Sequence, residues 1–483
     1  MLFNSLDFAV FLPLVFLLYW FVFHRSVRLR NAFLIAASYF FYGWWDWRFL
    51  FLIVFSTAVD YLVALRLGRE EAPARRKALL WTSVAVNIGF LGFFKYYNFF
   101  AENFVAAFTF FGASFSPATL HVVLPVGISF YTFQTLSYTI DVYKGKLEPS
   151  RDPVAYAAFV SFFPQLVAGP IERATNLLPQ FMKARSFHYG KAVDGLRQML
   201  WGFFQKVVIA DNCAVYVNEI FARSGELPGS TLVLGAVLFA FQIYGDFAGY
   251  SNIAIGTARL FGFDLMQNFA FPYFSRDIAE FWRRWHISLS TWFRDYLYIP
   301  LGGSRVGDWK KIRNTFVIFV VSGFWHGAAW TFIAWGFLNA LYFLPLFLAE
   351  KNRKYLDVAG RGRLLPGLRE AGSMAATFGL TVFGWIFFRA ESLSHAFSYI
   401  GNIFSATLFT MPGIAMGQIS MGVVAALIAF MLSVEWMARG DRHGLETVAA
   451  GWRRPLRWAF YYAILILIIR YAGPQQEFIY FQF

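Results

Sequence analysis

Charged residues are scarce in this sequence. Asp, Glu, Lys and Arg together make up only 14% of its 483 residues, whereas 58% of the residues are hydrophobic and 21% are aromatic. A soluble domain carries roughly 25% charged residues. Because so little charge cannot cover a water-exposed surface of this size, we predict that much of the surface faces lipid.

Cysteine is almost absent as well. The single cysteine, Cys213, excludes an intramolecular disulfide and a cysteine-cluster metal site. It is either packing material, the common role of a lone cysteine in a membrane, or an acyl-carrying nucleophile. No HExxH spacing occurs, and no Walker or Rossmann glycine motif follows a predicted strand. We therefore expect no metal site and no permanently bound cofactor.

The basic residues are gathered in short loops. The net charge is +14, and most Lys and Arg residues lie at 24–30, 66–77, 144–151, 173–191, 276–313, 351–369, 439–442 and 453–457. The positive-inside rule explains this placement if these loops are cytoplasmic, so no nucleic-acid partner is needed. The opposite turns, at 43–47, 223–229 and 389–417, are poor in Lys and Arg. We predict a multi-pass membrane protein with both termini outside; in a bacterium this is an inner-membrane protein whose termini lie in the periplasm.

The apolar residues form runs of the length that crosses a bilayer, about 20 residues for a helix. The first run lacks a basic leader and a small-residue cleavage site, so we interpret it as a retained span rather than a signal peptide. We predict an all-α polytopic membrane protein, with one domain over 1–483 and about 10–12 crossings. The runs centre near 2–23, 31–45, 48–65, 78–97, 121–142, 195–221, 231–260, 314–330, 331–349, 372–389, 416–437 and 455–472.

Two stretches break this pattern. Residues 263–313 are aromatic and charged at once, as in FWRRWHISLSTWFRDYLYIPLGGSR. They are too polar to span the membrane and too apolar for a solvated loop, so we expect a re-entrant or interfacial segment on the cytoplasmic side. Residues 154–170, which end in FFPQLVAGP, have a similar character because prolines and a glycine interrupt helical hydrogen bonding.

His326 is the sharpest candidate for chemistry. It lies in SGFWHGAAW, within the helices expected over 314–349, and a polar side chain at membrane depth needs a partner or a function. Gly323 and Gly327 leave room for backbone or substrate to approach closely. A neutral imidazole can take a hydroxyl proton as a general base. From these residues alone, a catalytic role and a buried structural role are both open.

A basic cluster surrounds a second histidine, His286. Arg283, Arg284 and Arg294 lie near it on the predicted cytoplasmic side. Positive charge beside a cavity suits an anionic partner, such as the phosphates of a coenzyme. The alternative is a girdle of arginines that bind anionic lipid headgroups.

Acidic residues at membrane depth also need an explanation. Asp246, in QIYGDFAGYS, would be satisfied by a protein-lined polar cavity or a buried hydrogen-bond network. We count it with the three arginines among the candidate donor-binding or tunnel residues. For Asp141 and Asp211 we favour structural pairing. The other histidines lie in loops or near span ends, where surface or interface roles are the default: His24, His121, His188, His395 and His443.

These motifs resemble the membrane-bound O-acyltransferase (MBOAT) family, and within it the bacterial alginate O-acetyltransferase branch. The resemblance covers nearly the whole chain, from ASYFFYGWWDWRF to EFIYFQF. It is densest in LPVGISFYTFQTLSYTIDVYKG, FPQLVAGPIER, YGDFAGYSNIAIG, PYFSRDIAEFWRRWHISLSTWFRDYLYIPLGGSR, SGFWHGAAWTFIAWG and GWIFFRAES.

The resemblance implies a ring of tilted helices around a central tunnel that joins the two sides of the membrane. It implies that His326 is the family's invariant catalytic histidine, and that His286 occupies the position of its second functional polar residue. We expect both to belong to the catalytic site, while a chemical, a structural and a donor-binding role all stay open for His286.

The resemblance also implies a reaction. We expect an O-acyltransferase that moves an acetyl group from a cytoplasmic donor, acetyl-CoA, to a hydroxyl of an exported polysaccharide such as alginate, directly or through a periplasmic partner acyltransferase. Relatives with this architecture serve cellulose, peptidoglycan or teichoic acid, so the polymer stays open. The rival classes are a transporter that moves an acyl donor or polymer without making bonds, and a scaffold for polysaccharide synthesis.

Overall fold

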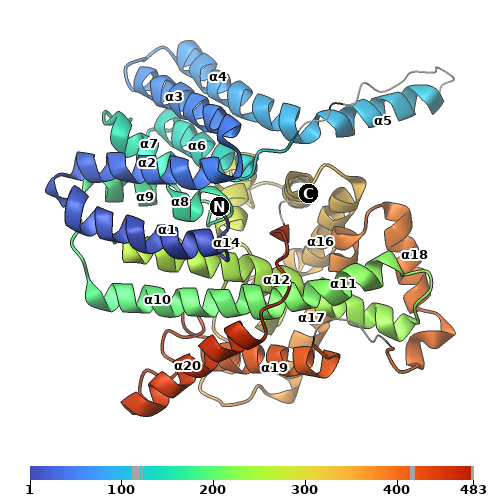
Figure 1. Cartoon of the computed structure of the whole chain (residues 1–483). Helices are drawn as coiled ribbons and strands as arrows, with labels where there is room; N and C mark the ends of the chain where they lie inside the picture. The colour runs from blue at the N-terminus through green and yellow to red at the C-terminus, as the bar shows by residue number, and fades with distance from the viewer. Residues whose placement is uncertain (111–119, 121–122, 414–418, 480–483) are drawn as a thin grey trace. The chain divides into compact units, whose positions relative to one another are not determined.

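The computed structural model describes residues 1–110, 120, 123–413 and 419–479, which form helices and loops and contain no strand (Figure 1). His121 and the end of the EFIYFQF motif lie outside the described residues. The contacts divide the chain into two compact units: unit 1 comprises residues 1–192 and 257–266, and unit 2 comprises residues 193–256 and 267–483. The single domain predicted over 1–483 stays a prediction.

Unit 1 is a helical bundle. Helices α3, α4 and α6 pack side by side in it, and α2 packs against α7 (Figure 1). Helix α2 begins where the Ser26 hydroxyl accepts a hydrogen bond from the backbone N–H of Leu29, a standard N-terminal cap. The helices of this unit are α1 (Leu6–Leu17), α2 (Val27–Asp46), α3 (Leu50–Leu67), α4 (Pro73–Leu91), α5 (Tyr97–Phe110), α6 (Ile128–Tyr143), α7 (Pro153–Ser161), α8 (Phe163–Leu166) and α9 (Ala174–Met182).

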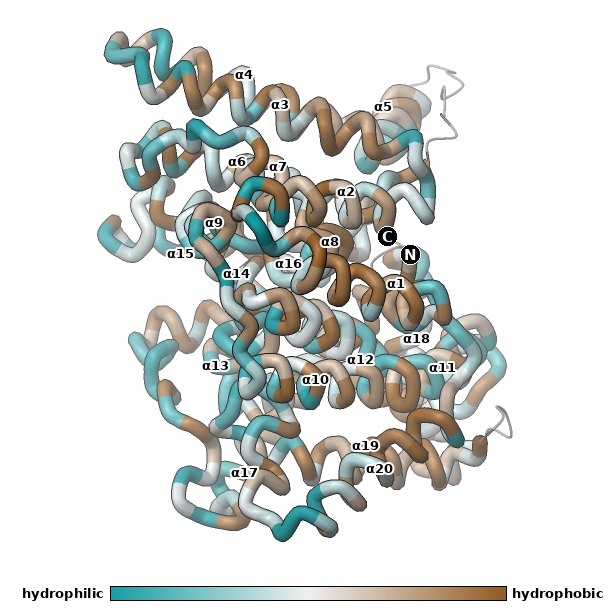
Figure 2. Tube along the Cα trace, turned by 60° about the vertical axis from the view of Figure 1, so that its left-hand side comes forward, coloured by the Kyte–Doolittle hydropathy of each residue, from teal (hydrophilic) through white to brown (hydrophobic). Residues whose placement is uncertain are grey.

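Helix α1 is apolar on both of its faces. Phe8 and Phe11 are buried against the rest of the unit, whereas Leu6, Val10 and Leu14 point outward with exposed fractions of 87%, 63% and 55%. Figure 2 shows the helix in hydrophobic colours along most of its length. A helix that exposes leucine and valine on its outer face is suited to lipid rather than water.

A buried polar cluster joins three helices of unit 1. Asp60 of α3 is fully buried and accepts hydrogen bonds from the Ser83 hydroxyl, at 2.5 Å, and the Asn87 amide, at 2.9 Å, both on α4. The Asn87 oxygen accepts a further bond from Thr135 of α6 at 3.1 Å. These bonds replace the water that Asp60 loses on burial, so an apolar bundle can contain a carboxyl group.

Unit 2 contains both segments in which the sequence placed its candidate site. Helices α15 and α16 form an antiparallel pair, and α16 also packs against α17. The helices are most of α10 (Tyr189–Phe203), α11 (Asp211–Ala222), most of α12 (Gly229–Leu260), α13 (Ile278–Arg284), α14 (Ile287–Phe293), α15 (Asp308–His326), α16 (Trp330–Leu348), α17 (Leu368–Arg389), α18 (Leu393–Ile403), α19 (Met421–Met437) and α20 (Arg454–Arg470).

Six helical stretches of the described chain are long and apolar enough to cross a membrane: Leu6–Arg25, Val27–Leu67, Pro73–Thr109, Gly229–Leu260, Trp330–Leu348 and Leu368–Arg389. Helix α19 is apolar but shorter. Other predicted runs are helical but fall short. Helices α6 and α20 have 16 and 17 residues, below the roughly 20 that a crossing needs, and α15 begins with a charged turn. The chain is thus a multi-pass helical membrane protein, and the count of about 10–12 crossings stays a prediction.

Glycines let α15 and α16 approach each other closely. A Cβ atom at Gly323 would collide with the backbone oxygen of Phe332, and one at Gly336 with the backbone oxygen of Phe319. A Cβ atom at Gly327 would collide with the Phe332 ring. From the sequence, either backbone or substrate could use the space beside Gly323 and Gly327, and the structure shows that packing within the protein fills it.

Candidate active site

Two histidines lie close together in unit 2. His326 is the last residue of α15, and His286 stands between α13 and α14. Their ring centroids are 6.4 Å apart, and the exposed fractions of the two residues are only 3% and 1%. The structure therefore brings together the two histidines that the sequence had indicated.

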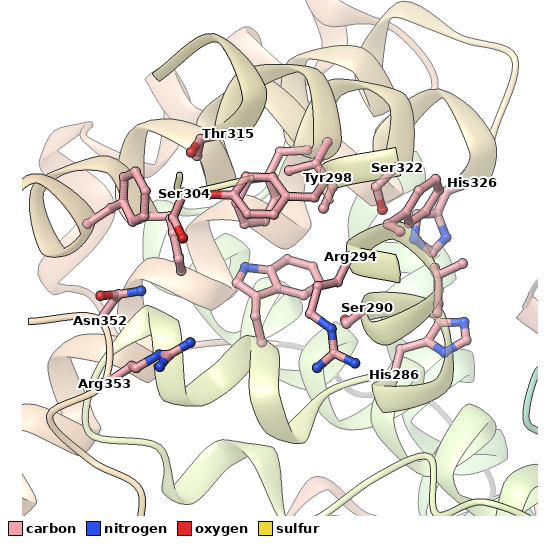
Figure 3. Close-up of a pocket in the computed structure, with 17 residues that line it drawn as sticks. His286, Ser290, Arg294, Tyr298, Ser304, Thr315, Ser322, His326, Asn352 and Arg353 are labelled. Carbon is pink, nitrogen blue, oxygen red and sulfur yellow. The ribbon is translucent and has the colours of Figure 1, made fainter. Parts of the chain in front are cut away.

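Both histidines line a cavity of about 240 Å³. Figure 3 shows them at one end of it, with Asn352 and Arg353 at the opposite end and Arg294 between. Much of the wall is aromatic or aliphatic, and side-chain hydroxyl groups such as that of Ser322 provide hydrogen-bonding groups in it. None of the described residues that line the cavity is Asp or Glu. The cavity thus presents two imidazoles at one end and two guanidinium groups along the rest.

His286 has an unusual backbone conformation. Its φ of 44° and ψ of 54° lie in the left-handed region, which residues other than glycine rarely adopt and which recurs at functional sites. Its Nδ1 lies 3.0 Å from the side-chain oxygen of Asn268. His286 lies outside the six candidate spans, and burial lowers its pKa to about 3. The imidazole is therefore neutral at physiological pH.

His326 is surrounded by aromatic rings. The rings of Trp335 and Phe388 lie 5.2 Å and 5.4 Å from its imidazole, both close to edge-on. Trp385 stacks on Trp335 at 5.6 Å. These packed rings hold the imidazole in one place and exclude water from that side of it, which is the setting that a positioned general base needs.

Two of the predicted arginines hold a loop rather than line the cavity. Arg283 donates to the backbone oxygens of Asn352, at 2.6 Å, and Tyr355, at 2.7 Å. Arg284 forms an ion pair of 2.9 Å with the buried Glu280. By fixing the segment after α16, Arg283 helps to place the cavity residues Asn352 and Arg353. A direct donor-binding role for Arg283 and Arg284 stays a prediction, and protein groups occupy guanidinium donors of both.

Arg294 is the predicted arginine that reaches the cavity. Its side chain is 57% exposed and bonds to Asp295 at 2.7 Å. Arg353 joins it from the loop after α16. No sequence pattern singles out Arg353, Asn352 or Ser322. They are ordinary polar residues by local pattern, and only the packing of the loop and of α15 brings them to the cavity.

Asp246 does not line the cavity. Its Oδ1 lies 2.6 Å from Nζ of Lys206, which also pairs with Asp211 at 2.8 Å. Its Oδ2 accepts a hydrogen bond from the backbone N–H of Ile479 at 2.6 Å. The structural pairing predicted for Asp211 is confirmed. The tunnel role of Asp246 stays a prediction, and the observed partners give it a structural role.

His443 and Cys213 are both buried away from the cavity. The surface or interface role expected for His443 is wrong, because this residue is 1% exposed and its Nε2 lies 3.1 Å from a carboxylate oxygen of Asp194. The loop after α19 folds back onto α10, and the Asp194 contact offsets the lost hydration. Cys213 is fully buried in α11 and does not line the cavity, a position that fits packing material.

The sequence model of the MBOAT, membrane-bound O-acyltransferase family matches residues 150–348, a range that contains both histidines. Over its whole length the chain is 38% identical to a probable alginate O-acetylase AlgI of Pseudomonas putida, all of which is also covered. The chain therefore belongs to the membrane-bound O-acyltransferase family and is an acyltransferase.

The names of two further relatives mention alginate and peptidoglycan, respectively. The chain is similar to a probable alginate O-acetylase AlgI of Azotobacter vinelandii, with 40% identity over 89% of this chain and 84% of the relative. It is also similar to a peptidoglycan O-acetyltransferase of Helicobacter pylori, with 36% identity over 82% of this chain and 78% of the relative. The reaction class is common to these relatives, whereas the polymer differs.

Proposed function

We propose that this chain transfers an acetyl group from acetyl-CoA, at the cytoplasmic face of a bacterial inner membrane, to a hydroxyl of an exported polysaccharide of the alginate kind. The acceptor hydroxyl belongs to the sugar itself or to a periplasmic partner acyltransferase that then acylates the polymer. The observation that carries this proposal is the polarity of the cavity, which has two histidines at one end and two arginines along the rest (Figure 3).

The basic part of the cavity suits the donor. Arg294 and Arg353 line it without an acidic residue among the described lining residues, so a ligand that carries phosphate groups is favoured there. A volume of about 240 Å³ is below the roughly 300–1,000 Å³ of pockets that enclose a drug-sized ligand. The cavity therefore takes the thioester arm of the donor up to the diphosphate, which lies at the two arginines, while the adenosine extends beyond it.

The histidine end suits the chemistry. An alcohol is almost fully protonated at neutral pH, so its attack on a thioester needs a base. His326 takes the hydroxyl proton as the alcohol oxygen forms a bond to the thioester carbonyl carbon. The carbon–sulfur bond then breaks, and the leaving thiolate takes the proton from the imidazolium. The products are the acetyl ester and free CoA, and both His326 and the rest of the protein are regenerated.

The acceptor is proposed from the relatives. Two similar proteins are named as probable alginate O-acetylases and one as a peptidoglycan O-acetyltransferase. Both names describe the O-acetylation of a polymer. Alginate is the first choice because the P. putida relative is similar along the whole chain.

The test uses the purified full-length protein in lipid nanodiscs with acetyl-CoA labelled in the acetyl group. De-O-acetylated alginate oligosaccharides are the probe acceptor, and peptidoglycan fragments are the comparison. We expect label in an alkali-labile ester on the alginate oligosaccharide. A parallel incubation with periplasmic extract detects transfer through a partner protein.

The outcomes separate the rival classes. Label on the peptidoglycan fragments alone would show that the acceptor is peptidoglycan rather than alginate, and the proposed acetyl transfer would still hold. In sealed proteoliposomes, labelled donor that enters the lumen without forming an ester would indicate a transporter. A folded protein that neither forms an ester nor moves the donor would contradict the proposal.

A further inference from the structure

Asn268 holds the second histidine of the cavity through its side chain. Its oxygen lies 3.0 Å from Nδ1 of His286 and also accepts a bond of 2.9 Å from the Ser288 hydroxyl. Its nitrogen donates to the Ser251 hydroxyl at 3.1 Å. Asn268 is fully buried, and the exposed fraction of His286 is 1%. Water therefore does not compete for these bonds.

The partners fix which way the amide points. The backbone N–H of Ser288 can only donate, and it points at the same side-chain atom of Asn268, at 3.4 Å. That atom must therefore be the oxygen, which leaves the nitrogen to face Ser251. With an oxygen opposite, Nδ1 of His286 has to carry the proton of the neutral ring.

The backbone supports the same arrangement. The main-chain oxygen of Asn268 accepts a bond of 2.9 Å from the N–H of Ile287, directly after the left-handed residue His286. The ring of Phe247 lies 4.6 Å from the imidazole, close to edge-on, and that of Trp325 lies 6.1 Å from it. A ring held from two sides and bonded at Nδ1 keeps one orientation.

We propose that Asn268 is a positioning residue, which keeps His286 in the tautomer with a proton on Nδ1 and a lone pair on Nε2. His286 then meets the substrate as a hydrogen-bond acceptor for an O–H or N–H group. In this tautomer His286 cannot donate from Nε2 to the thioester carbonyl oxygen. This inference rests on the acyl transfer proposed above, and it assigns the kind of contact that His286 makes within that reaction.

Kinetics of three variants test the positioning role, with labelled acetyl-CoA and the alginate oligosaccharides as substrates. Asn268→Leu removes the acceptor for Nδ1–H, so we expect kcat to fall at least about tenfold while KM for acetyl-CoA is unchanged. Asn268→Asp keeps an oxygen in that place and should recover most of the lost kcat. The matched control is Asn87→Leu, which removes a buried amide from unit 1 and should lower thermal stability without lowering kcat of the folded protein.

Some kinetic outcomes would overturn the inference. A wild-type kcat in folded Asn268→Leu would do so, and so would an Asn268→Asp variant as slow as Asn268→Leu, because Asp keeps the oxygen that accepts from Nδ1 of His286. Thermal unfolding of each variant shows whether the kinetic comparison is made on folded protein.

Nitrogen-15 NMR reads the tautomer without any reaction. In protein labelled with ¹⁵N-histidine, the His286 signals are identified by their loss in His286→Gln. We expect a protonated Nδ1 and an unprotonated Nε2 in the wild type, and the opposite tautomer or an imidazolium at neutral pH would contradict the inference. If the wild type transfers no label, the proposed function fails while the NMR result still decides the tautomer.

Discussion

At the scale of single residues, the imidazole of His326 combines burial with access to a cavity. It is 3% exposed, it contacts the Trp335 and Phe388 rings, and it lines the space that also holds His286. The close glycines beside it are explained by the packing of α15 on α16 and give no support to catalysis. The catalytic assignment of His326 therefore depends on the cavity, on the proximity of His286 and on the family.

We predict that His326→Ala lowers acetyl transfer by at least about 10², the lower end of what a general base contributes. The reason is that the variant has no proton acceptor for the attacking hydroxyl. Transfer is measured with labelled acetyl-CoA, beside expression level and thermal unfolding. Near-normal transfer in the folded variant would remove the general-base role, whereas a variant that does not fold would favour a structural role.

The arginines provide a second prediction, which compares Arg294 with Arg284. Arg294 lines the cavity, so Arg294→Gln should raise KM for acetyl-CoA by roughly tenfold through loss of a charge-assisted bond. Arg284 pairs with the buried Glu280, so Arg284→Gln should lower thermal stability and leave KM nearly unchanged. Steady-state kinetics and thermal unfolding measure the two effects. An unchanged KM in Arg294→Gln would contradict the donor-binding role and favour the alternative that Arg294 binds anionic lipid headgroups.

At the scale of elements, the π-helical turn Phe204–Ala210 lies between α10 and α11 and bonds to the C-terminal segment through Lys206. Lys206 on this turn pairs with Asp211 and Asp246, and it also donates to the backbone oxygen of Gln476 at 3.3 Å. A π-helical turn adds a residue to the helix and turns its side chains, and such turns are frequent at functional sites. Here the turn directs the Lys206 side chain into the protein, where its ammonium group pairs with the carboxylates of Asp211 and Asp246.

The charge balance of this cluster leads to a third prediction. Lys206→Met leaves Asp211 and Asp246 buried together without a cation, and we expect it to cost about 3–5 kcal/mol of stability. Asp211→Asn is the matched control, because it leaves one lysine with one carboxylate and should change stability little. Thermal unfolding of the purified variants gives the comparison. Equal melting temperatures for Lys206→Met and the wild type would show that the cluster does not stabilise the unit.

At the scale of the whole molecule, the distribution of charge predicts the orientation in the membrane. The basic segments lie between the apolar runs, and a single register places them all on the cytoplasmic side. In that predicted register the segment 263–313, with its arginines, faces the cytoplasm, the side from which the proposed donor acetyl-CoA would reach the cavity.

The fourth prediction is that both termini face the periplasm. Fusions of alkaline phosphatase and of a fluorescent protein after Phe483 and before Met1 report the side on which each end lies, because each reporter is active on one side only. We expect phosphatase activity and no fluorescence at both ends. Fluorescence from the fusion after Phe483 would overturn the orientation.

The sequence by itself determined the class of this protein. Low charge, long apolar runs and basic loops indicate a membrane protein because hydropathy along the chain decides where a segment is stable. The positions of most helices follow from the same property. The motifs around His286 and His326 indicated the family and the residues of the site, since each motif is local in sequence.

Only the tertiary structure decided which side chains meet. Arg294 lines the cavity, whereas Arg283 bonds to the loop after α16 and Arg284 to Glu280, although all three look alike in sequence. Asn268, which holds His286, carries no local pattern that marks it. Contacts such as that of Arg283 with Asn352 join residues far apart in the chain, and their formation depends on the packing of several segments at once, so local periodicity and composition do not contain them.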